Sequence, residues 1–276
     1  MKTGILTTPF AGEPLEKVAD FAENHGIVGL EIPVGPGVSH LDVAALTEER
    51  AGRLRESLEA RGLEITALAF HADTTSAGRE EAFQDRVKEV IVAAARLGTP
   101  ILSMCTGMPV DGLTRPETIR QVLPDILRPI LDYAGEKGVK VAVENTHYTC
   151  LRGLNTFECL FETFQDPHFG LTYDPAHLYH QECDHLLPIT EFGDRLFHVH
   201  AKDILIDYAK RARVGIYGDG WWRYVIPGFG HIHWGEFVSH LRAAGYNETL
   251  CIEHEDACQT REEGFIRGAW ILGQFC

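Results

Sequence analysis

Short apolar runs recur along the chain and alternate with longer segments of mixed polarity. The runs are rich in aliphatic and β-branched residues, which is typical of strands buried in a parallel sheet. They fall at residues 4–10, 28–33, 64–72, 100–106, 140–145, 169–174, 196–203 and 248–255. The sequence therefore predicts eight strands separated by longer connecting segments.

The connecting segments show the periodicity of amphipathic helices. Within 80–98, apolar residues recur at spacings of three and four, which places them on one face of a helix. Segment 47–62 is predicted to be helical as well. Several such segments end in a glycine directly before the next strand, as in RGLEITAL and RLGTPILS, and glycine commonly ends helices.

Strands that alternate with helices over the whole length predict a parallel sheet with right-handed crossovers. Eight such units predict closure into a (β/α)8 TIM barrel, with residues 1–276 as a single domain. The alternative is an open, doubly wound sheet. That fold normally has a glycine-rich phosphate turn after its first strand, and TTPFAGEP is not such a turn.

One segment, at about 204–233, interrupts the alternation. It is rich in glycine and aromatic residues and is too long for an ordinary connection, so we expect an irregular loop near the barrel mouth. We predict that its first part, 204–226, covers the mouth, because lids of this kind exclude water from small active sites.

Composition narrows the classes of function. A hydrophobic content of 45% and a charged content of 24% are ordinary for a soluble globular protein. The net charge of −15 argues against nucleic acid and anionic membranes as partners, because both need clustered Lys and Arg. No run approaches the roughly 20 apolar residues of a membrane helix. Seven scattered cysteines without CxxC spacing favour a reduced, cytoplasmic location.

Acids and a histidine stand at the ends of four consecutive predicted strands. Glu144 follows VAV, Asp174 follows LTY, His200 lies in HVHAKD, and Glu253 follows CI. Because the carboxyl ends of barrel strands form the active-site rim, we expect these side chains to meet there. Crowded carboxylates repel one another unless a cation lies between them. The mixed oxygen and nitrogen ligands suit Mn, Mg, Co or Zn.

Each residue also has a structural interpretation. Asp174 precedes Pro175 and could cap a helix, and Glu144 could pair with a lysine. Either His198 or His200, taken alone, would more often be a hydrogen-bonded core residue. The concurrence of four metal-type side chains favours a metal site over these alternatives.

The sequence resembles the sugar phosphate isomerase/epimerase family of xylose isomerase-like TIM barrels, which also includes endonuclease IV. The motifs that carry the resemblance are VAVEN, YDPAH, HVHAKD, IPGFGHIHW and GYNETLCIEHED. The likeness extends over nearly the whole chain and is strongest across 140–256. It implies a divalent-metal-dependent sugar isomerase or epimerase that transfers protons through a metal-stabilised enediolate.

The resemblance also assigns residues to roles. Glu144, Asp174, His200 and Glu253 are expected to bind one divalent cation, with the two glutamates on opposite faces of the substrate as proton carriers. His177, the histidine of the D-x-x-H motif, is expected to contact the substrate oxygen that becomes part of the enediolate. Such a cation acidifies the C–H bond next to a carbonyl because charge develops on the coordinated oxygens.

Other residues are candidates for holding the substrate. Lys202 shares the face of the metal histidine and could donate to a substrate oxyanion, although a surface lysine is the alternative. Ketose 3-epimerases of this family carry a glutamate and an arginine at the positions of Cys150 and Ile206. Because both are missing here, Arg223 of the irregular loop is predicted to take over the role of the arginine. The loop aromatics Trp221, Trp222, Tyr224 and Phe229 could stack on a sugar or pack on the barrel rim, and Trp222 is the one predicted to contact the substrate.

Three further residues are assigned supporting roles. His198 lies one pleat deeper than His200 and is predicted to orient it or to fill the core. Glu255 is expected to point away from the site or to support its ligands. His233 is expected to cap the helix that follows it.

Competing functions use the same barrel. A metal-dependent lyase or dehydratase of a keto-sugar or keto-acid would form the same enolate and expel a β-hydroxyl. An endonuclease IV-like nuclease needs further ligands on the third and fourth strands. His71 is suitably placed for this, but the fourth strand ends in Ser103, Met104 and Cys105. A sugar-binding barrel without catalysis is the last alternative. The expected partner is a small carbohydrate or keto-acid, and a homo-oligomer is left open.

Overall fold

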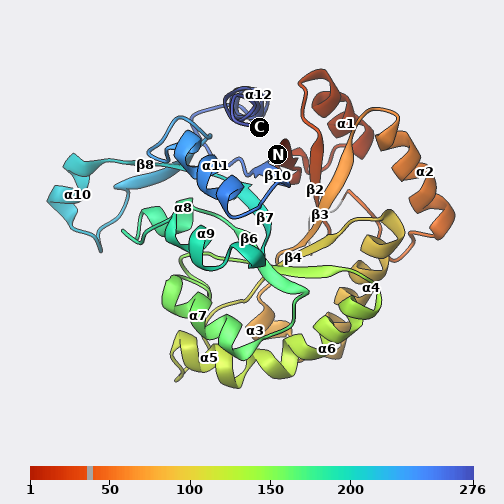
Figure 1. Ribbon diagram of the computed structural model, residues 1–276, viewed down its shortest axis with the longest axis horizontal. Coiled ribbons are helices and arrows are strands. Elements are labelled where there is room, and N and C mark those ends of the chain that lie inside the picture. Colours follow the sequence, from red (N-terminus) through yellow and green to blue (C-terminus); the bar gives the residue numbers. More distant parts are fainter. Residues whose placement is uncertain (36–39) are drawn as a thin grey trace.

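The computed structural model describes residues 1–35 and 40–276 (Figure 1). Eight parallel strands close into a barrel, which confirms the predicted (β/α)8 fold. They are β1 (Lys2–Leu6), β2 (Gly29–Pro33), β3 (Glu64–Phe70), β4 (Ile101–Cys105), β5 (Lys140–Glu144), β6 (Phe169–Tyr173), β7 (Leu196–Ala201) and β10 (Thr249–Ile252). Around the barrel they follow the order β1-β10-β7-β6-β5-β4-β3-β2, so β5, β6, β7 and β10 are successive neighbours.

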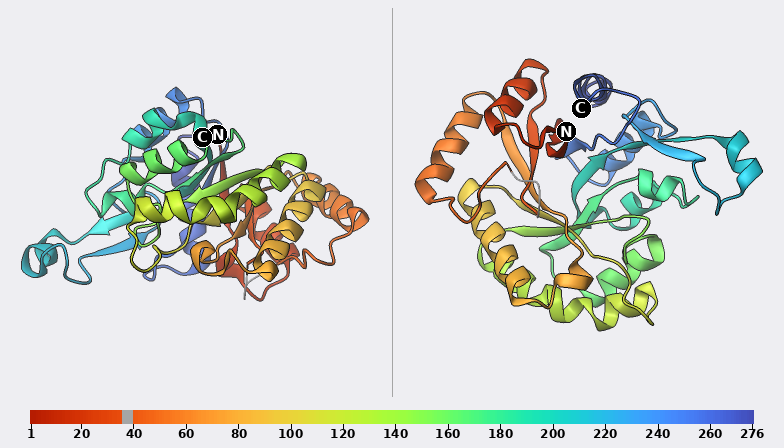
Figure 2. Two further views of the ribbon diagram at one scale, coloured as in Figure 1. Left: turned by 90° about the horizontal axis from the view of Figure 1, so that it is seen from below. Right: turned by 180° about the vertical axis from the view of Figure 1, so that it is seen from behind.

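Helices cover the outside of the barrel (Figures 1 and 2). The longer ones are α1 (Leu15–Asn24), α2 (Glu48–Glu59), α4 (Glu81–Leu97), α6 (Leu123–Glu136), α7 (Leu154–Thr163), α11 (Trp234–Ala243) and α12 (Arg261–Leu272). Shorter ones are α3 (Thr74–Ala77), α5 (Arg115–Gln121), α8 (Ala176–Tyr179) and α9 (Leu187–Glu191). Single 3-10 turns occur at Thr8–Phe10 and Gly193–Arg195.

The predicted helices at 47–62 and 80–98 correspond to α2 and α4. Thr47 caps α2 by accepting a hydrogen bond from the backbone N–H of Arg50. The apolar face of α4 is buried against the barrel, from Phe83 at one end to Leu97 at the other. Gly98 then ends α4 in the left-handed conformation with φ of 67°, as the glycine before the next strand predicted.

The segment predicted to be an irregular loop contains regular secondary structure, and that prediction was wrong for 204–225. Strand β8 (Asp203–Ile206) pairs antiparallel with β9 (Trp222–Val225), and helix α10 (Tyr208–Val214) lies between them. The hairpin could not be recognised from the sequence because a long tip separates its two short strands. Figures 1 and 2 show α10 projecting sideways from the barrel. Only the base of the hairpin is therefore placed to cover the mouth.

The buried carboxylate of Asp203 joins the HVHAKD and IPGFGHIHW motifs. It accepts hydrogen bonds from the backbone N–H groups of Gly228 (2.9 Å), Gly230 (3.2 Å) and Ile232 (3.1 Å) and from the indole N–H of Trp234 (3.0 Å). A Cβ atom at Gly230 would lie 2.2 Å from Asp203 Oδ1, so the close approach requires glycine. Asp203 thus fixes the turn that leads from the hairpin into α11.

His233 stands directly before α11. His233 occupies the N-cap position of α11, but its side chain makes no capping hydrogen bond, so the predicted capping role was wrong. Among the described residues, no helix combines the length and the apolar character that crossing a membrane requires.

Candidate metal centre

The four strand-end residues meet at one place, as the sequence predicted. Glu144 ends β5, Asp174 follows β6, His200 lies in β7, and Glu253 follows β10. One ligand atom from each lies within 4.8 Å of the others. Closure of the barrel places the ends of these neighbouring strands side by side. The geometry brings the predicted ligands together, while their role in metal binding stays a prediction.

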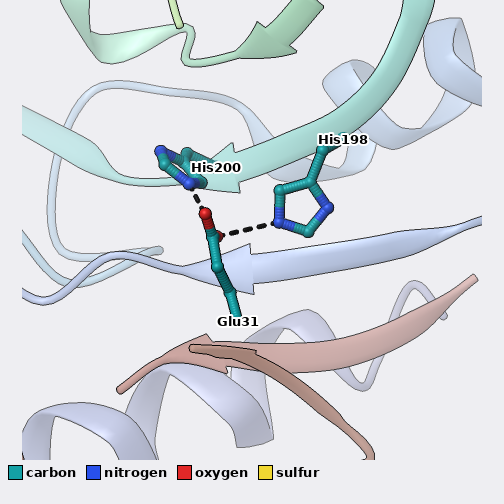
Figure 3. Close-up of side chains that lie close together, drawn as sticks. All are labelled: Glu31, His198 and His200. Carbon is teal, nitrogen blue, oxygen red and sulfur yellow. Dashed lines mark hydrogen bonds and ion pairs between the residues drawn. The ribbon is translucent and has the colours of Figure 1, made fainter. Parts of the chain in front are cut away.

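His200 is held from both sides of its ring. Its Nδ1 lies 3.1 Å from Glu144 Oε1 and 3.1 Å from Glu253 Oε2. Its Nε2 lies 2.8 Å from Oε2 of Glu31, which comes from β2 (Figure 3). The same oxygen lies 2.9 Å from Nε2 of His198, as predicted for an orienting or core residue.

Sequence reasoning missed Glu31. The available signal was an ionisable residue inside the apolar run VGLEIP, where the side chain is fully buried. Burial alone would raise the pKa of Glu31, but His200 and His198 lower it well below its usual value. Burial likewise opposes the charged form of His200, yet Glu31, Glu253 and Glu144 raise its pKa well above the usual value. The ionised carboxylate of Glu31 therefore faces the imidazole of His200 and stabilises its protonated form.

Asp174 directs an oxygen that accepts no hydrogen bond into the site. Its Oδ1 accepts a hydrogen bond from the backbone N–H of Ala176 at 2.8 Å, and its own backbone pairs with the side chain of Asn145. Its buried Oδ2 makes no hydrogen bond, although Lys202 Nζ lies 3.0 Å away. Burial raises the pKa of Asp174 to about 7, against the opposing effect of Lys202. This oxygen, two further carboxylates and an imidazole fit a divalent cation.

Lys202 is buried inside the site, so its alternative interpretation as a surface residue was wrong. Only 1% of its surface is exposed. Its Nζ lies 2.8 Å from Glu253 Oε2 and 3.5 Å from Glu255 Oε1. Burial opposes the charged ammonium, but Asp174 and Glu253 raise its pKa well above the usual value. Lys202 therefore supplies a positive charge beside the candidate metal ligands.

His177 lies against Lys202 and the hairpin. Its Nε2 is 3.2 Å from Lys202 Nζ and 3.5 Å from Asp174 Oδ2. Its Nδ1 is 2.8 Å from the hydroxyl of Tyr224, whose ring also covers Lys202 Nζ at 4.6 Å from the ring centroid. Burial and the charge of Lys202 lower the pKa of His177 well below its usual value, so the imidazole is neutral. From the sequence, Tyr224 was only one of several loop aromatics that could stack on a sugar or pack on the barrel rim, and the hairpin brings it to the site.

The two predicted substrate residues of the hairpin differ in position. The ring of Trp222 stacks on His180 at 4.4 Å between centroids and lies 5.6 Å from the ring of His147. Trp222 and His147 also line a cleft of about 880 Å³ between the hairpin tip and helices α5 and α7. Arg223 instead donates to Asp256 at 2.8 Å. Trp222 is thus placed next to the site, whereas Arg223 is engaged elsewhere.

A second group of possible ligands adjoins Glu144. One atom each from His71, Cys105 and Glu144 lies within 4.8 Å of the others. Cys105 Sγ is 3.9 Å from Glu144 Oε2, and His71 Nε2 is 3.3 Å from Ser103 Oγ. Burial and Glu144 raise the pKa of Cys105 well above its usual value. Its thiol therefore holds its proton, whereas the thiolate is the form that binds metals.

Comparisons with known proteins agree with this fold. A protein-family model described as "Xylose isomerase-like TIM barrel" matches residues 19–272. The chain is 27% identical over 310 residues to the uncharacterized protein YfiH of Bacillus subtilis (strain 168), with 99% of each covered. It is also 27% identical to an inosose dehydratase of Geobacillus thermodenitrificans (strain NG80-2), over 73% of this chain and 72% of that protein.

Solved structures extend the likeness in fold. A probable 3-DHS dehydratase, AsbF of Bacillus anthracis, superposes with a TM-score of 0.79 at 17% identity, covering 99% of both chains. A D-psicose 3-epimerase from Clostridium cellulolyticum H10 superposes with a TM-score of 0.74 at 14% identity, covering 100% of this chain and 98% of that one.

Proposed function

Because the chain belongs to the xylose isomerase-like TIM-barrel family, we propose that it is a divalent-metal-dependent sugar isomerase or epimerase. The reaction would move a proton at a carbon next to the carbonyl of a small carbohydrate or keto-acid. The observation that carries this proposal is the convergence of Glu144, Asp174, His200 and Glu253, where one buried oxygen of Asp174 accepts no hydrogen bond.

These four residues are the ones that would hold the cation. When bound, the cation supplies a Lewis acid that stabilises negative charge on the oxygens of the substrate. Manganese, magnesium, cobalt and zinc all suit the ligand set.

Glu253 and Glu144 are placed to carry the proton. Burial would raise the pKa of Glu253, but Lys202 and His200 lower it well below its usual value. Glu253 therefore stays a carboxylate, the form that accepts a proton. Glu144 approaches the same His200 atom from β5, and a second carboxylate there can return the proton to the substrate.

His177 and Lys202 are placed to hold the substrate oxygen. Lysine only donates hydrogen bonds, so its contact makes Nε2 of His177 the acceptor and leaves the ring proton on Nδ1, facing Tyr224. The donor for the substrate oxygen is therefore the ammonium of Lys202, which His177 orients, because a donor directed at an oxygen on which charge develops stabilises the transition state. Trp222 would contact the substrate on the side where the hairpin lies.

Dehydration is the second candidate function. The named relative is an inosose dehydratase, and a dehydratase begins with the same proton abstraction. It then needs an acid that protonates the departing hydroxyl. Lys202 is a buried cation 2.8 Å from Glu253, so it could supply that proton from the same position.

The test is an exchange experiment in deuterated water with the metal-loaded protein and small ketoses, keto-acids and inositol ketones. We expect solvent deuterium on the carbon next to the carbonyl of a true substrate. The Glu253→Gln variant keeps one coordinating oxygen but loses the basic carboxylate, so exchange should fall by about 10²–10⁴. Glu248→Gln, exposed near the other end of the same strand, should leave it unchanged.

The product of the reaction distinguishes isomerisation or epimerisation from dehydration. An isomer or epimer that carries deuterium supports the first proposal, and loss of water from the substrate supports dehydration. Turnover without any label, when the quench time is varied to exclude internal return of the proton, would contradict proton transfer.

A further inference from the structure

A second buried cluster lies directly behind the candidate metal centre. It consists of Glu31, His198 and His200, which are buried in the barrel interior (Figure 3). Strand β2 carries Glu31 and β7 carries both histidines, and these strands are separated by β1 and β10 in the barrel order. The contact therefore crosses the interior of the barrel instead of following its wall.

We propose that Glu31 is a positioning residue that fixes the proton of His200 on Nε2 and thereby turns the Nδ1 atom toward the cation. The inference rests on the proposed metal site and adds a residue that determines its affinity. Histidine ligands of metals commonly donate their other ring N–H to a carboxylate, which sets the tautomer and the ring orientation.

The hydrogen-bonding capacity of the groups carries the argument. A carboxylate only accepts, so Nε2 of His200, 2.8 Å from Glu31 Oε2, must be the donor. Nδ1 is then the one ring nitrogen left to face Glu144 and Glu253, each at 3.1 Å. Without a cation, a proton on Nδ1 can serve both carboxylates. A divalent cation held by these residues would replace that proton, while the proton on Nε2 stays with Glu31.

The orientation of Glu31 is itself determined by its neighbours. Nε2 of His198 lies 2.9 Å from Glu31 Oε2, and the thiol of Cys251 lies 3.3 Å from the same oxygen. Among the described residues, Oε1 has no hydrogen-bond partner. Three donors on one oxygen hold the carboxylate in a single rotation, so Glu31 cannot turn away from His200 without losing all of them.

The same pattern argues against a second cation between Glu31, His198 and His200. Both imidazoles approach one carboxylate oxygen at hydrogen-bond distance, which requires a proton on each nitrogen. A cation would need the lone pairs of both nitrogens instead. The inference thus predicts one cation per chain, bound on the Nδ1 side of His200.

The first measurement is the affinity for Mn²⁺ and Zn²⁺, obtained by chelator competition with the full-length protein. In Glu31→Leu the side chain keeps most of its bulk but offers no oxygen that could accept from either histidine. We expect the dissociation constant to rise by about 10–100-fold. The matched control Glu64→Gln changes a glutamate that pairs with Lys2 at the start of β3 and should bind within twofold of wild type.

The second measurement reports the tautomer directly. Nitrogen-15 NMR of the zinc-loaded wild type should show the proton of His200 on Nε2, and Glu31→Leu should lose this single assignment. A merely structural role for Glu31 would change stability without changing the tautomer. If Glu31→Leu does not fold, Glu31→Asp withdraws the carboxylate by one methylene and should also weaken binding at least tenfold.

The possible results of these measurements have different consequences for the role of Glu31 and for the proposed function. Equal metal affinity of wild type and the Glu31 variant that folds would overturn the inference, while one tightly bound cation would still support the proposed function. Two cations per wild-type chain, one of them lost in the Glu31 variant, would overturn it by making Glu31 a ligand. A wild-type chain that binds no divalent cation would overturn both proposals.

Discussion

At the scale of single residues, the main feature of the candidate metal centre is the balance between its buried positive and negative charges. Lys202 Nζ lies 3.0 Å from Asp174 Oδ2 and 2.8 Å from Glu253 Oε2, with almost no contact with solvent. Taking an ammonium and two carboxylates out of water is costly, and their mutual attraction offsets that cost only while every partner is present. Lys202 and a divalent cation therefore neutralise overlapping sets of carboxylates.

This overlap predicts the behaviour of Lys202→Met. In the presence of a chelator, the variant leaves buried carboxylates without their nearest cation, and its free energy of unfolding should fall by about 3–5 kcal/mol. A saturating divalent cation should reduce the loss, because its charge replaces that of the ammonium. Urea denaturation with and without metal measures both values.

Lys17→Met is the matched control, since Lys17 is exposed on α1, and it should change stability little under either condition. A penalty for Lys202→Met that is the same with chelator and with metal would show that the two cations do not share ligands.

At the scale of elements, the hairpin and the turn after it complete the site. Strand β9 carries Tyr224 onto His177 and Trp222 onto His180, so residues far apart in the sequence become one wall. The hairpin is anchored where β8 begins, at Asp203. This residue directly follows Lys202, so the same short stretch supplies a buried cation to the site and an anchor to the turn.

Asp203→Ala should therefore destabilise the protein strongly. The change leaves four backbone N–H groups, those of Ile204, Gly228, Gly230 and Ile232, and one indole N–H without their acceptor. Each buried unsatisfied donor costs about 1–3 kcal/mol, so we expect a loss of at least about 3 kcal/mol in the free energy of unfolding.

Chemical denaturation measures this loss. Asp219→Ala, at the exposed tip of the same hairpin, should stay within about 0.5 kcal/mol of wild type. A small effect of Asp203→Ala would mean that the turn at 226–233 holds its shape without the carboxylate.

At the scale of the whole molecule, the negative charge of the chain favours the binding of a divalent cation. The chain carries a net charge of −15, and three of its carboxylates converge on one end of the barrel. A cation that binds the folded chain and not the unfolded one stabilises the fold by mass action. Free metal at 100 times the dissociation constant adds about 2.7 kcal/mol.

Divalent metal should thus raise the melting temperature of the whole barrel, by roughly 5 °C under those conditions. Differential scanning calorimetry with Mn²⁺ or Zn²⁺ against a chelator measures the shift, and elemental analysis should give one ion per chain. The double variant Asp174→Ala/Glu253→Ala should show no shift. A shift of wild-type size in this variant would place the cation elsewhere.

Much of this protein could be predicted from local patterns in the sequence. Eight apolar runs separated by amphipathic segments identified the barrel, because strand and helix periodicity depends on neighbours a few residues apart. Glu144, Asp174, His200 and Glu253 were found because the carboxyl ends of parallel barrel strands must share a rim. Both inferences need only the order of residues along the chain.

The tertiary structure decided what depends on the directions of side chains across the barrel. Glu31 meets His200 only after β2 and β7 close around a common interior, and no spacing in the sequence encodes that distance. The burial of Lys202 and its contact with His177 follow from the same closure. The pairing of β8 with β9 was invisible because a helix-containing tip separates two four-residue strands, too short for a periodic signal. Local propensity thus specifies the elements, whereas packing at long range selects which polar groups face one another.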